Sequence, residues 1–187
     1  MQSEDRDRTD RCLVNRFLAG DQTSFDQLVL RYQDSLHRFF CRSTDVDAAD
    51  DLAQDAFLEV YRSLATWRGQ SSFRTWLFGV ARNVGGRHLR RRLESHRADE
   101  VETPVDGIAD TGRGPLQSLD DGDQNAALLN AVARLPWEQR VAIVLRAMGG
   151  MSYDQIAIIT GAPKGTVRSR LHSARQALAR VIREELP

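Results

Sequence analysis

Lysine is almost absent from this chain of 187 residues, because Lys164 is the only lysine among its 26 basic residues. This bias is typical of a GC-rich bacterial genome and indicates nothing about mechanism. Cysteine is nearly as rare: Cys12 and Cys41 lie far apart, without a Cys-x-x-Cys motif or clustered histidines beside them. The sequence therefore favours neither a disulfide framework nor a zinc site, and two small buried thiols are expected.

Long apolar runs are also missing. No segment approaches the roughly 20 apolar residues that a membrane-spanning helix needs, and residues 1–11 lack the apolar core of a secretory signal. We therefore expect a cytoplasmic protein without membrane insertion. The histidines are scattered and supply no ligand set, so no metal and no cofactor is expected; they are His37, His88, His96 and His172.

Period-two alternation, which is typical of strands, is not sustained anywhere, whereas helical periodicity is frequent. The expected fold class is all-α. Apolar spacing and helix-ending residues predict helices over 13–18, 24–41, 48–66, 72–92, 126–135 and from Pro136 to about Gly149. Ser24 with Gln27 predicts a capping box at the start of the second of these. The helix over 48–66 places Asp51, Asp55 and Glu59 in one row that faces solvent or a partner.

The charge is arranged in blocks, although the formal net charge is zero. Residues 45–59 contain six acids and no base, residues 67–97 eight arginines and one glutamate, and residues 98–123 eight acids and one arginine. The last block is also rich in glycine, which is typical of a linker. We predict a disordered segment over 1–10, helical domains over 11–97 and 124–187, and a flexible acidic linker over 98–123. Extended, this linker would span on the order of 85 Å, enough for the domains to contact distant sites on a large partner.

Residues 152–172 predict a helix-turn-helix, the second helix of which binds duplex DNA. Ser152 and Gln155 form a capping box, and Gly161 with Pro163 ends one helix and begins the next. The second helix has a buried stripe formed by Val167, Leu171, Ala174 and Leu178. Its opposite face carries arginine, histidine and serine side chains, which suit guanine edges and phosphates. Residues 162–183 hold six basic residues and no acid, and a merely solvated basic face is the alternative interpretation.

A second nucleic-acid signal lies in residues 67–92, where aromatic side chains alternate with arginines. Aromatic rings stack on unpaired bases and arginines hold the backbone, so this segment suits melted DNA better than duplex. Glycine and serine at residues 69–72 would form a loop whose pocket receives a flipped base. The alternative for Trp76 is a core role, because Trp76, Leu77, Val80 and Val84 also fall at helical spacing.

Four segments together resemble the extracytoplasmic-function (group 4) sigma factors of bacterial RNA polymerase: residues 50–57 (DDLAQDAF), 73–83 (FRTWLFGVARN), 135–140 (LPWEQR) and the helix-turn-helix. They follow the family's order and spacing, and the resemblance covers about residues 12–182. It implies a non-enzymatic subunit with two small helical domains. The first would bind the β′ clamp helices of core RNA polymerase and the promoter −10 element, and the second the −35 element and the β flap.

The resemblance also assigns site residues. Polymerase binding falls on Asp51, Leu52, Gln54, Asp55 and Leu58. Contacts to the −10 element fall on Arg68, Phe73, Trp76, Arg82, Asn83, Arg87, Arg90 and Arg91. Contacts to the −35 element fall on Lys164, Thr166, Arg168, Ser169, His172, Ser173 and Arg175. Ser173 stands where many members carry arginine, so the −35 sequence cannot be taken from a relative.

Regulation is implied by the resemblance rather than by any motif. The acidic linker would run near the active-site cleft of the polymerase and yield to growing RNA. A large third domain and an acidic autoinhibitory domain are missing from the sequence, and such short members are commonly held silent by an anti-sigma factor. The promoters and the inducing signal are not indicated.

Two other functions fit parts of the sequence. A stand-alone helix-turn-helix regulator would explain residues 152–183, but it would leave residues 50–57 and the aromatic and basic segment unexplained. A magnesium-dependent nuclease would use Asp50, Asp51 and Asp55 as metal ligands. No general base or nucleophile accompanies those carboxylates, which instead have the spacing of an exposed helix face.

Overall fold

The computed structural model describes residues 2–99 and 123–185, and these are helical without any strand, which confirms the all-α prediction. The predicted flexible linker lies almost entirely outside the described residues. None of the described helices is long and apolar enough to cross a membrane. In chain order the elements are α1 (Gln2–Leu18), α2 (Thr23–Ser43), α3 (Ala49–Ser63), the short 3-10 helix η1 (Leu64–Thr66), α4 (Phe73–Asp99), α5 (Asp123–Ala133), α6 (Trp137–Gly149), α7 (Tyr153–Thr160) and α8 (Lys164–Glu185).

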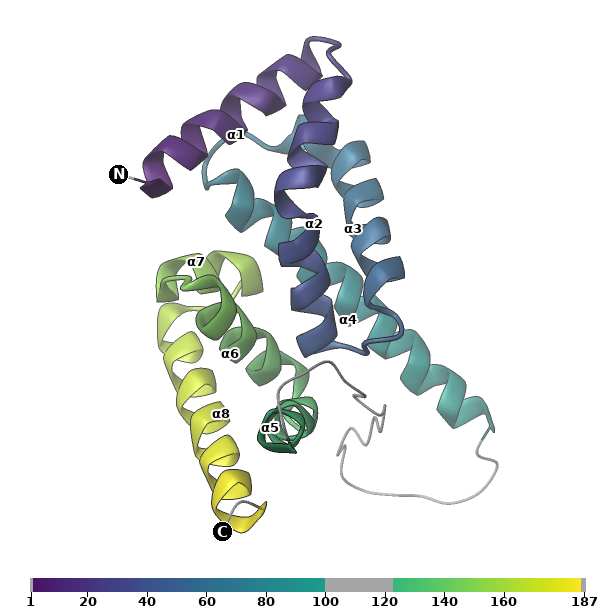
Figure 1. Cartoon of the computed structure of the whole chain (residues 1–187), viewed down its shortest axis with the longest axis vertical. Coiled ribbons are helices and arrows are strands. Elements are labelled where there is room, and N and C mark those ends of the chain that lie inside the picture. Colours follow the sequence, from purple (N-terminus) through teal and green to yellow (C-terminus); the bar gives the residue numbers. More distant parts are fainter. Residues whose placement is uncertain (1, 100–122, 186–187) are drawn as a thin grey trace.

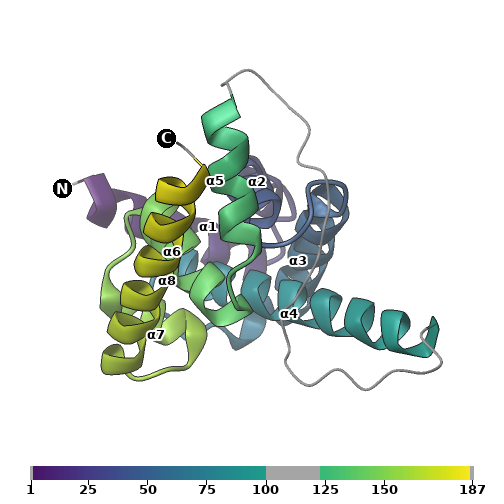
Figure 2. The same cartoon turned by 90° about the horizontal axis from the view of Figure 1, so that it is seen from below.

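Helices α1–α4 form a first group, in which α2 packs against α1, α3 and α4 (Figure 1). The apolar side of α2 is buried as its periodicity predicts, with Leu36 and Phe40 fully enclosed. The inward side of α3, from Ala49 to Val60, is buried against it. The second half of α4 extends away from the rest of the molecule (Figure 2). This places a long basic helix at the edge of the group.

Helix α1 begins at Gln2, so the predicted disordered segment over 1–10 is wrong for residues 2–10. The Asp10 carboxylate is fully buried, accepts a hydrogen bond from the Tyr32 hydroxyl and pairs with Arg31 at 3.2 Å. Burial raises the pKa of Asp10, and Tyr32 and Arg31 counteract that rise. Sequence composition missed this helix because its anchoring partners lie on α2, more than 20 residues away.

The capping box predicted at Ser24 and Gln27 is also wrong. Helix α2 starts at Thr23, so Ser24 lies inside it, and its hydroxyl donates to the carboxylate of Asp21 at 2.8 Å. The other Asp21 oxygen accepts from the Thr23 backbone N–H at 3.1 Å and from the Thr23 hydroxyl at 2.6 Å. These hydrogen bonds, with a contribution from Arg16, hold the pKa of Asp21 well below its usual range. The Asp21 carboxylate therefore accepts the hydrogen bonds at the start of α2, a role that the sequence assigned to the Ser24 hydroxyl.

The expectation of two buried thiols is wrong for Cys12, which is exposed, and Cys41 is half-buried. Cys12 lies on the outer face of α1, whereas the following Leu13 and Val14 are buried. The Cys41 sulfur lies 3.5 Å from His37 Nε2 on the same helix. Burial raises the pKa of the Cys41 thiol, which lowers its fraction of reactive thiolate at neutral pH.

Helices α5–α8 form a second group. In it, the start of α7 and the ends of α6 and α7 lie where the sequence predicts them. The capping box of Ser152 and Gln155 is present, with hydrogen bonds of 3.2 and 2.9 Å. Gly150 and Gly161 end α6 and α7 in left-handed conformations, with φ of 57° and 62°. A side chain would be strained at either position. These two turns set the positions of α7 and α8.

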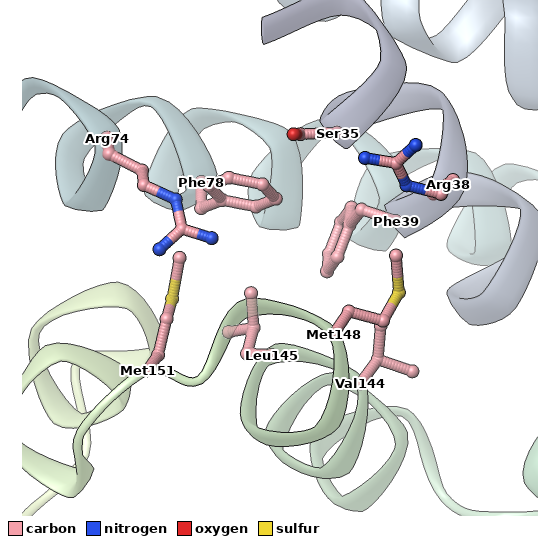
Figure 3. A pocket seen from close by; sticks show the side chains of 9 residues that line it. All are labelled: Ser35, Arg38, Phe39, Arg74, Phe78, Val144, Leu145, Met148 and Met151. Atoms are coloured by element: carbon pink, nitrogen blue, oxygen red, sulfur yellow. The ribbon is translucent and has the colours of Figure 1, made fainter. Parts of the chain in front are cut away.

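The second group packs against the first, although the predicted long linker suggested separate domains. Helices α6 and α7 lie beside α2 and α4 (Figure 1), and buried side chains of both groups form one apolar cluster. A small cavity of about 30 Å³ lies at this contact. Figure 3 shows Phe39 and Phe78 on one side of it and Leu145 and Met151 on the other. That volume is far below the roughly 300 Å³ of a small-molecule site. The cavity is therefore too small to hold a substrate-sized molecule.

Candidate nucleic-acid interface

The acidic row of α3 is exposed over its first two turns. Asp51, Gln54 and Asp55 are exposed, and so is the apolar Leu58, at 51% of its surface. Leu52 is 3% exposed and belongs to the core, so a direct contact of Leu52 with a partner is a wrong prediction. Its position on the helix explains this, because residues 52, 56 and 60 share the inward side of α3. The remaining side chains form an acidic surface with an apolar centre.

Glu59, the third member of the predicted row, already has a partner. Its carboxylate pairs with Arg87 of α4 at 2.9 Å, with both side chains about half exposed. Arg92 and His88 of α4 similarly approach Asp45, which precedes α3. Burial, followed by the charge of Arg91, lowers the pKa of His88. The acidic and basic blocks of the sequence thus partly neutralise each other within the first group of helices.

Asn83 is exposed to solvent near the middle of α4, and Arg87, Arg90 and Arg91 are exposed beyond it. Arg82 is half-buried, and its guanidinium donates to Asn83 Oδ1 at 3.2 Å and to the carboxylate of Glu138 on α6. The first contact orients the Asn83 amide. The second brings a carboxylate from the other group of helices onto the predicted −10 surface.

Hydrogen bonds within the loop before α4, and between this loop and the first turn of α4, hold the loop in place. The Ser72 hydroxyl accepts from the Thr75 backbone N–H at 3.1 Å, which caps α4, and the Trp67 indole donates to the Ser71 carbonyl at 3.3 Å. Gly69 has a φ of 69°. Arg68 is exposed at the tip of this loop.

Arg11 of α1 holds the loop from outside, a role that sequence reasoning missed. Its guanidinium donates to the Gly69 carbonyl at 3.2 Å and lies 5.6 Å from the centre of the Trp67 ring. A Cβ atom at Gly69 would approach Arg11 Nη1 to 2.9 Å, so this arginine closely covers the glycine. The contact spans 58 positions, and no local pattern indicates it.

Phe73 and Trp76, the two aromatic residues predicted to contact the −10 element, differ in how far they are buried. Phe73 is 1% exposed and packs against Tyr32, Trp67 and Trp76, with ring centroids 5.6, 5.9 and 6.0 Å away. A direct base contact by Phe73 is therefore a wrong prediction. Trp76 is only partly buried and packs against the core, so part of its side chain stays exposed to solvent.

The predicted reading face of α8 is open to solvent. Val167, Leu171 and Ala174 are fully buried, which confirms the apolar stripe, while Leu178 is half-buried. The opposite face has an exposed set formed by Arg168, Ser169, His172, Ser173 and Arg175. Lys164 is exposed and pairs with Asp154 of α7 at 2.9 Å, and the Thr166 carbonyl accepts from the Ser169 hydroxyl at 2.9 Å. The first turns of α8 thus present arginine, histidine and hydroxyl groups together.

The first turn of α6 supplies an arginine whose role was not predicted. Arg140 is 3% exposed, and its guanidinium donates to the carbonyls of Ala133, Leu135 and Ser43. It therefore satisfies backbone oxygens at the ends of α5 and α2. The predicted segment 135–140 is thus a structural junction between the two groups of helices.

Carboxylates of the acidic block do not form a metal site. Among the described side chains, no group of three or more His, Cys, Asp and Glu residues is arranged to hold a metal ion. Asp50 instead lies 3.3 Å from His37 Nε2. The nuclease alternative therefore has no ligand set in this part of the chain.

Comparisons with known proteins match both groups of helices. The family model "Sigma-70 region 2" matches residues 28–94, and "Sigma-70, region 4" matches residues 125–178. The ECF RNA polymerase sigma-E factor of Escherichia coli is 35% identical over 176 residues, which is 91% of this chain and 92% of that protein. The chain belongs to the extracytoplasmic-function sigma factors. The predicted family and its non-enzymatic role in transcription initiation are confirmed.

Other relatives agree with this membership. The RNA polymerase sigma-H factor of Pseudomonas aeruginosa is 35% identical over 181 residues, covering 92% of this sigma factor and 93% of the relative. The sigma factor RpoE of Bartonella quintana, solved in complex with the anti-sigma factor NepR, superposes with a TM-score of 0.65 at 29% identity, over 85% of this chain and 96% of that one. CnrH, solved with the cytosolic domain of CnrY, gives a TM-score of 0.67 at 25% identity over 94% and 98% of the two chains.

Proposed function

We propose that this sigma factor uses three separate surfaces during initiation. The exposed part of α3 binds the β′ clamp helices, the start of α4 and its preceding loop hold the melted −10 strand, and α8 reads the −35 element while its domain contacts the β flap. The observation that carries the proposal is the chemical difference between exposed faces of one chain: acidic with an apolar centre on α3, and basic on α4 and α8. Distinct charges favour distinct partners.

The three surfaces divide the proposed residues as follows. Polymerase binding rests on Asp51, Gln54, Asp55 and Leu58, with Leu52 supporting them from the core. The −10 contacts rest on Arg68, Trp76, Arg82, Asn83, Arg87, Arg90 and Arg91, with Phe73 behind them. The −35 contacts rest on Lys164, Thr166, Arg168, Ser169, His172, Ser173 and Arg175. The corresponding domains are residues up to 97 and residues from 124, joined by the acidic linker.

An anti-sigma factor is the proposed regulator. RpoE of Bartonella quintana is solved with the anti-sigma factor NepR, and this sigma factor superposes on RpoE over most of both chains. An anti-sigma factor that covers α3 or α8 would block the surfaces that polymerase and promoter need. We place this chain, its polymerase and its DNA in the cytoplasm.

The competing function is a polymerase-independent regulator, and the two are separated by mixing purified chain with core RNA polymerase. The proposal expects a stoichiometric complex in size-exclusion chromatography, formed without DNA. A chain that elutes alone and instead binds a palindromic duplex as a dimer would overturn the proposal.

A further inference from the structure

We infer that Arg11 of α1 is a positioning residue for promoter recognition. It fixes the shape of the loop formed by residues 67–72, the pre-α4 loop, and thereby sets how strictly this loop selects a base of the −10 element. The inference rests on the proposed function in one respect, namely that the pre-α4 loop meets the melted −10 strand. The hold of Arg11 on the loop rests on contacts within the chain.

The guanidinium of Arg11 contacts the pre-α4 loop at two points. Its Nη2 donates to the Gly69 carbonyl at 3.2 Å, and its central carbon lies 5.6 Å from the centre of the Trp67 ring. Trp67 is the first residue of the loop, and Gly69 makes its turn with a φ of 69°. One side chain therefore fixes both the entry and the turn. A planar group that donates and stacks at once is a property of arginine that lysine does not share.

Gly69 leaves the room that this contact needs. A Cβ atom at Gly69 would lie 2.9 Å from Nη1 of Arg11 and 3.2 Å from its Nη2. The position thus favours glycine twice, through its left-handed backbone and through the space that Arg11 fills. Arg68 and Gln70 flank the glycine and are exposed. Holding the Gly69 carbonyl consequently fixes the backbone from which two exposed side chains project.

Helix α1 gives Arg11 a rigid base beside the loop (Figure 1). The preceding Asp10 is fully buried and accepts from the Tyr32 hydroxyl of α2, and Val14 is 1% exposed. Tyr32 also packs against Phe73, the first residue of α4, with ring centroids 5.6 Å apart. The helix that carries Arg11 and the helix that follows the loop are therefore both fixed against the same residue of α2.

A loop that is ordered before DNA arrives favours the correct base over the others. It loses little conformational freedom on binding, and it does not reshape around a base that fits badly. Within the loop, the Trp67 indole donates to the Ser71 carbonyl at 3.3 Å, which joins the two ends of the loop, whereas Arg11 holds the turn between them. Loss of Arg11 should therefore lower base selectivity at the position that the loop meets.

The hold on the loop is tested without DNA or polymerase. Arg11→Gln removes the charge and the forked donor, and Arg8→Gln is the matched control, because Arg8 is exposed on the same helix and pairs with Asp5 at 4.0 Å. NMR relaxation of the full chain should show backbone order parameters of residues 68–72 falling from about 0.85 to below about 0.6 in Arg11→Gln, with no change in Arg8→Gln. Equal order in wild type and both variants would overturn the hold.

The effect on selectivity is tested with the chain assembled on core RNA polymerase. Run-off transcription is measured from promoters that carry each base at each −10 position behind one fixed −35 element. Arg11→Gln should lower the ratio between the best and the worst base about fivefold at one −10 position, the size of an exposed cation–π contact with a hydrogen bond. Arg8→Gln should leave every ratio as in wild type. Unchanged ratios for Arg11→Gln would overturn the inference.

Salt dependence separates positioning from a direct phosphate contact by Arg11. The assembled polymerase is titrated with a fluorescein-labelled single strand that carries the selected −10 sequence. Arg11→Gln should keep the wild-type slope of the logarithm of the binding constant against the logarithm of salt concentration. Arg87→Gln, at a proposed phosphate contact, should reduce the magnitude of that slope by about 0.7. An equal reduction for Arg11→Gln would overturn the positioning role.

Failure of the inference is separable from failure of the proposed function. The order parameters report the hold on the loop whether or not the chain binds polymerase. A wild-type chain without any base preference in the −10 element would overturn the proposed −10 role of the loop. A wild-type preference that Arg11→Gln leaves intact would overturn the inference alone.

Discussion

Arg168 is the residue whose proposed role is most specific. It lies exposed near the start of α8, beside the buried stripe that contains Val167 and Leu171. An arginine in that position can donate two hydrogen bonds to guanine O6 and N7.

Arg168→Ala should therefore weaken use of promoters with the preferred −35 sequence by about 1 to 3 kcal/mol and relax discrimination at one base pair. Arg180→Ala, an exposed arginine further along the same helix, is the control that should weaken all promoters alike. Transcription from a set of single-base −35 variants measures both effects. A uniform loss for Arg168→Ala would contradict base reading.

Asp21 gives a prediction about stability and pH. Its carboxylate accepts from Thr23 and Ser24 at the start of α2, and these bonds lower its pKa. A lowered pKa in the folded state stabilises the protein above the unfolded value of about 4, and this contribution is lost as the pH falls through the folded pKa.

Asp21→Ala should lower the Tm at pH 7, and the difference from wild type should shrink progressively below pH 4 or so. Thermal unfolding followed by circular dichroism measures it, with Asp26→Ala, at an exposed position in α2, as the control. A Tm difference that stays constant into acid would show that the charge of Asp21 is irrelevant.

Residue types alone could not separate contact residues from supporting ones. Leu52 and Phe73 lie within the segments that resemble sigma-factor motifs, yet both side chains are buried. Helical spacing already places Leu52 on the inward side of α3, and that signal outweighs its presence in the acidic segment. Arg11 and Asp10 were missed for a different reason, since their partners at Gly69 and Tyr32 are distant in sequence.

Individual elements were predicted well where apolar spacing and end signals agreed. Helices α3, α6 and α7 begin and end within a few residues of the expected positions, and Gly150 and Gly161 end their helices in the left-handed conformation that glycine favours. Helix α1 and the start of α2 were predicted wrongly. In the sequence, the buried carboxylate of Asp10 and the capping carboxylate of Asp21 look the same as aspartates on the surface.

Helix α3 carries the prediction that separates a sigma factor from a free-standing regulator. Asp51→Arg with Asp55→Arg should abolish binding to core RNA polymerase, because both carboxylates are exposed on the surface proposed to meet the clamp helices. Size-exclusion chromatography with core polymerase measures the loss. The helix should persist, since neither side chain is buried, and circular dichroism checks this.

The matched control for that double variant is Asp26→Arg with Asp47→Arg. It makes the same change in net charge at exposed positions outside the α3 row. Full binding by the control and none by the row variant is the expected pair of results. Equal binding by both would contradict the clamp assignment.

At the scale of the whole molecule, the sequence predicted two helical domains but not their contact. The acidic linker indicated independence, whereas Trp137, Glu138 and Arg140 all contact the first group of helices. Such a contact has no local signature, because a glycine pair in a helix indicates a close approach without naming the partner.

Free duplex DNA should be bound weakly and with steep salt dependence. The exposed cations of α8 are Lys164, Arg168, Arg175, Arg180 and Arg183. If all five contact phosphates, the logarithm of the binding constant should fall against the logarithm of the salt concentration with a slope of about −4.5. Arg180→Ala should reduce the magnitude of that slope by about 1. Fluorescence anisotropy at several salt concentrations measures it, and a slope near zero would contradict a phosphate-dominated interface.

The central claim is that this chain gives core RNA polymerase its choice of promoter. Run-off transcription with core polymerase, the purified chain and a library of fragments randomised at the −35 and −10 elements tests it most directly. The account predicts initiation from a defined subset of fragments, with Arg168→Ala changing the selected −35 sequence and leaving the selected −10 sequence as it is. No initiation by the wild-type chain, together with no binding to core polymerase, would contradict it.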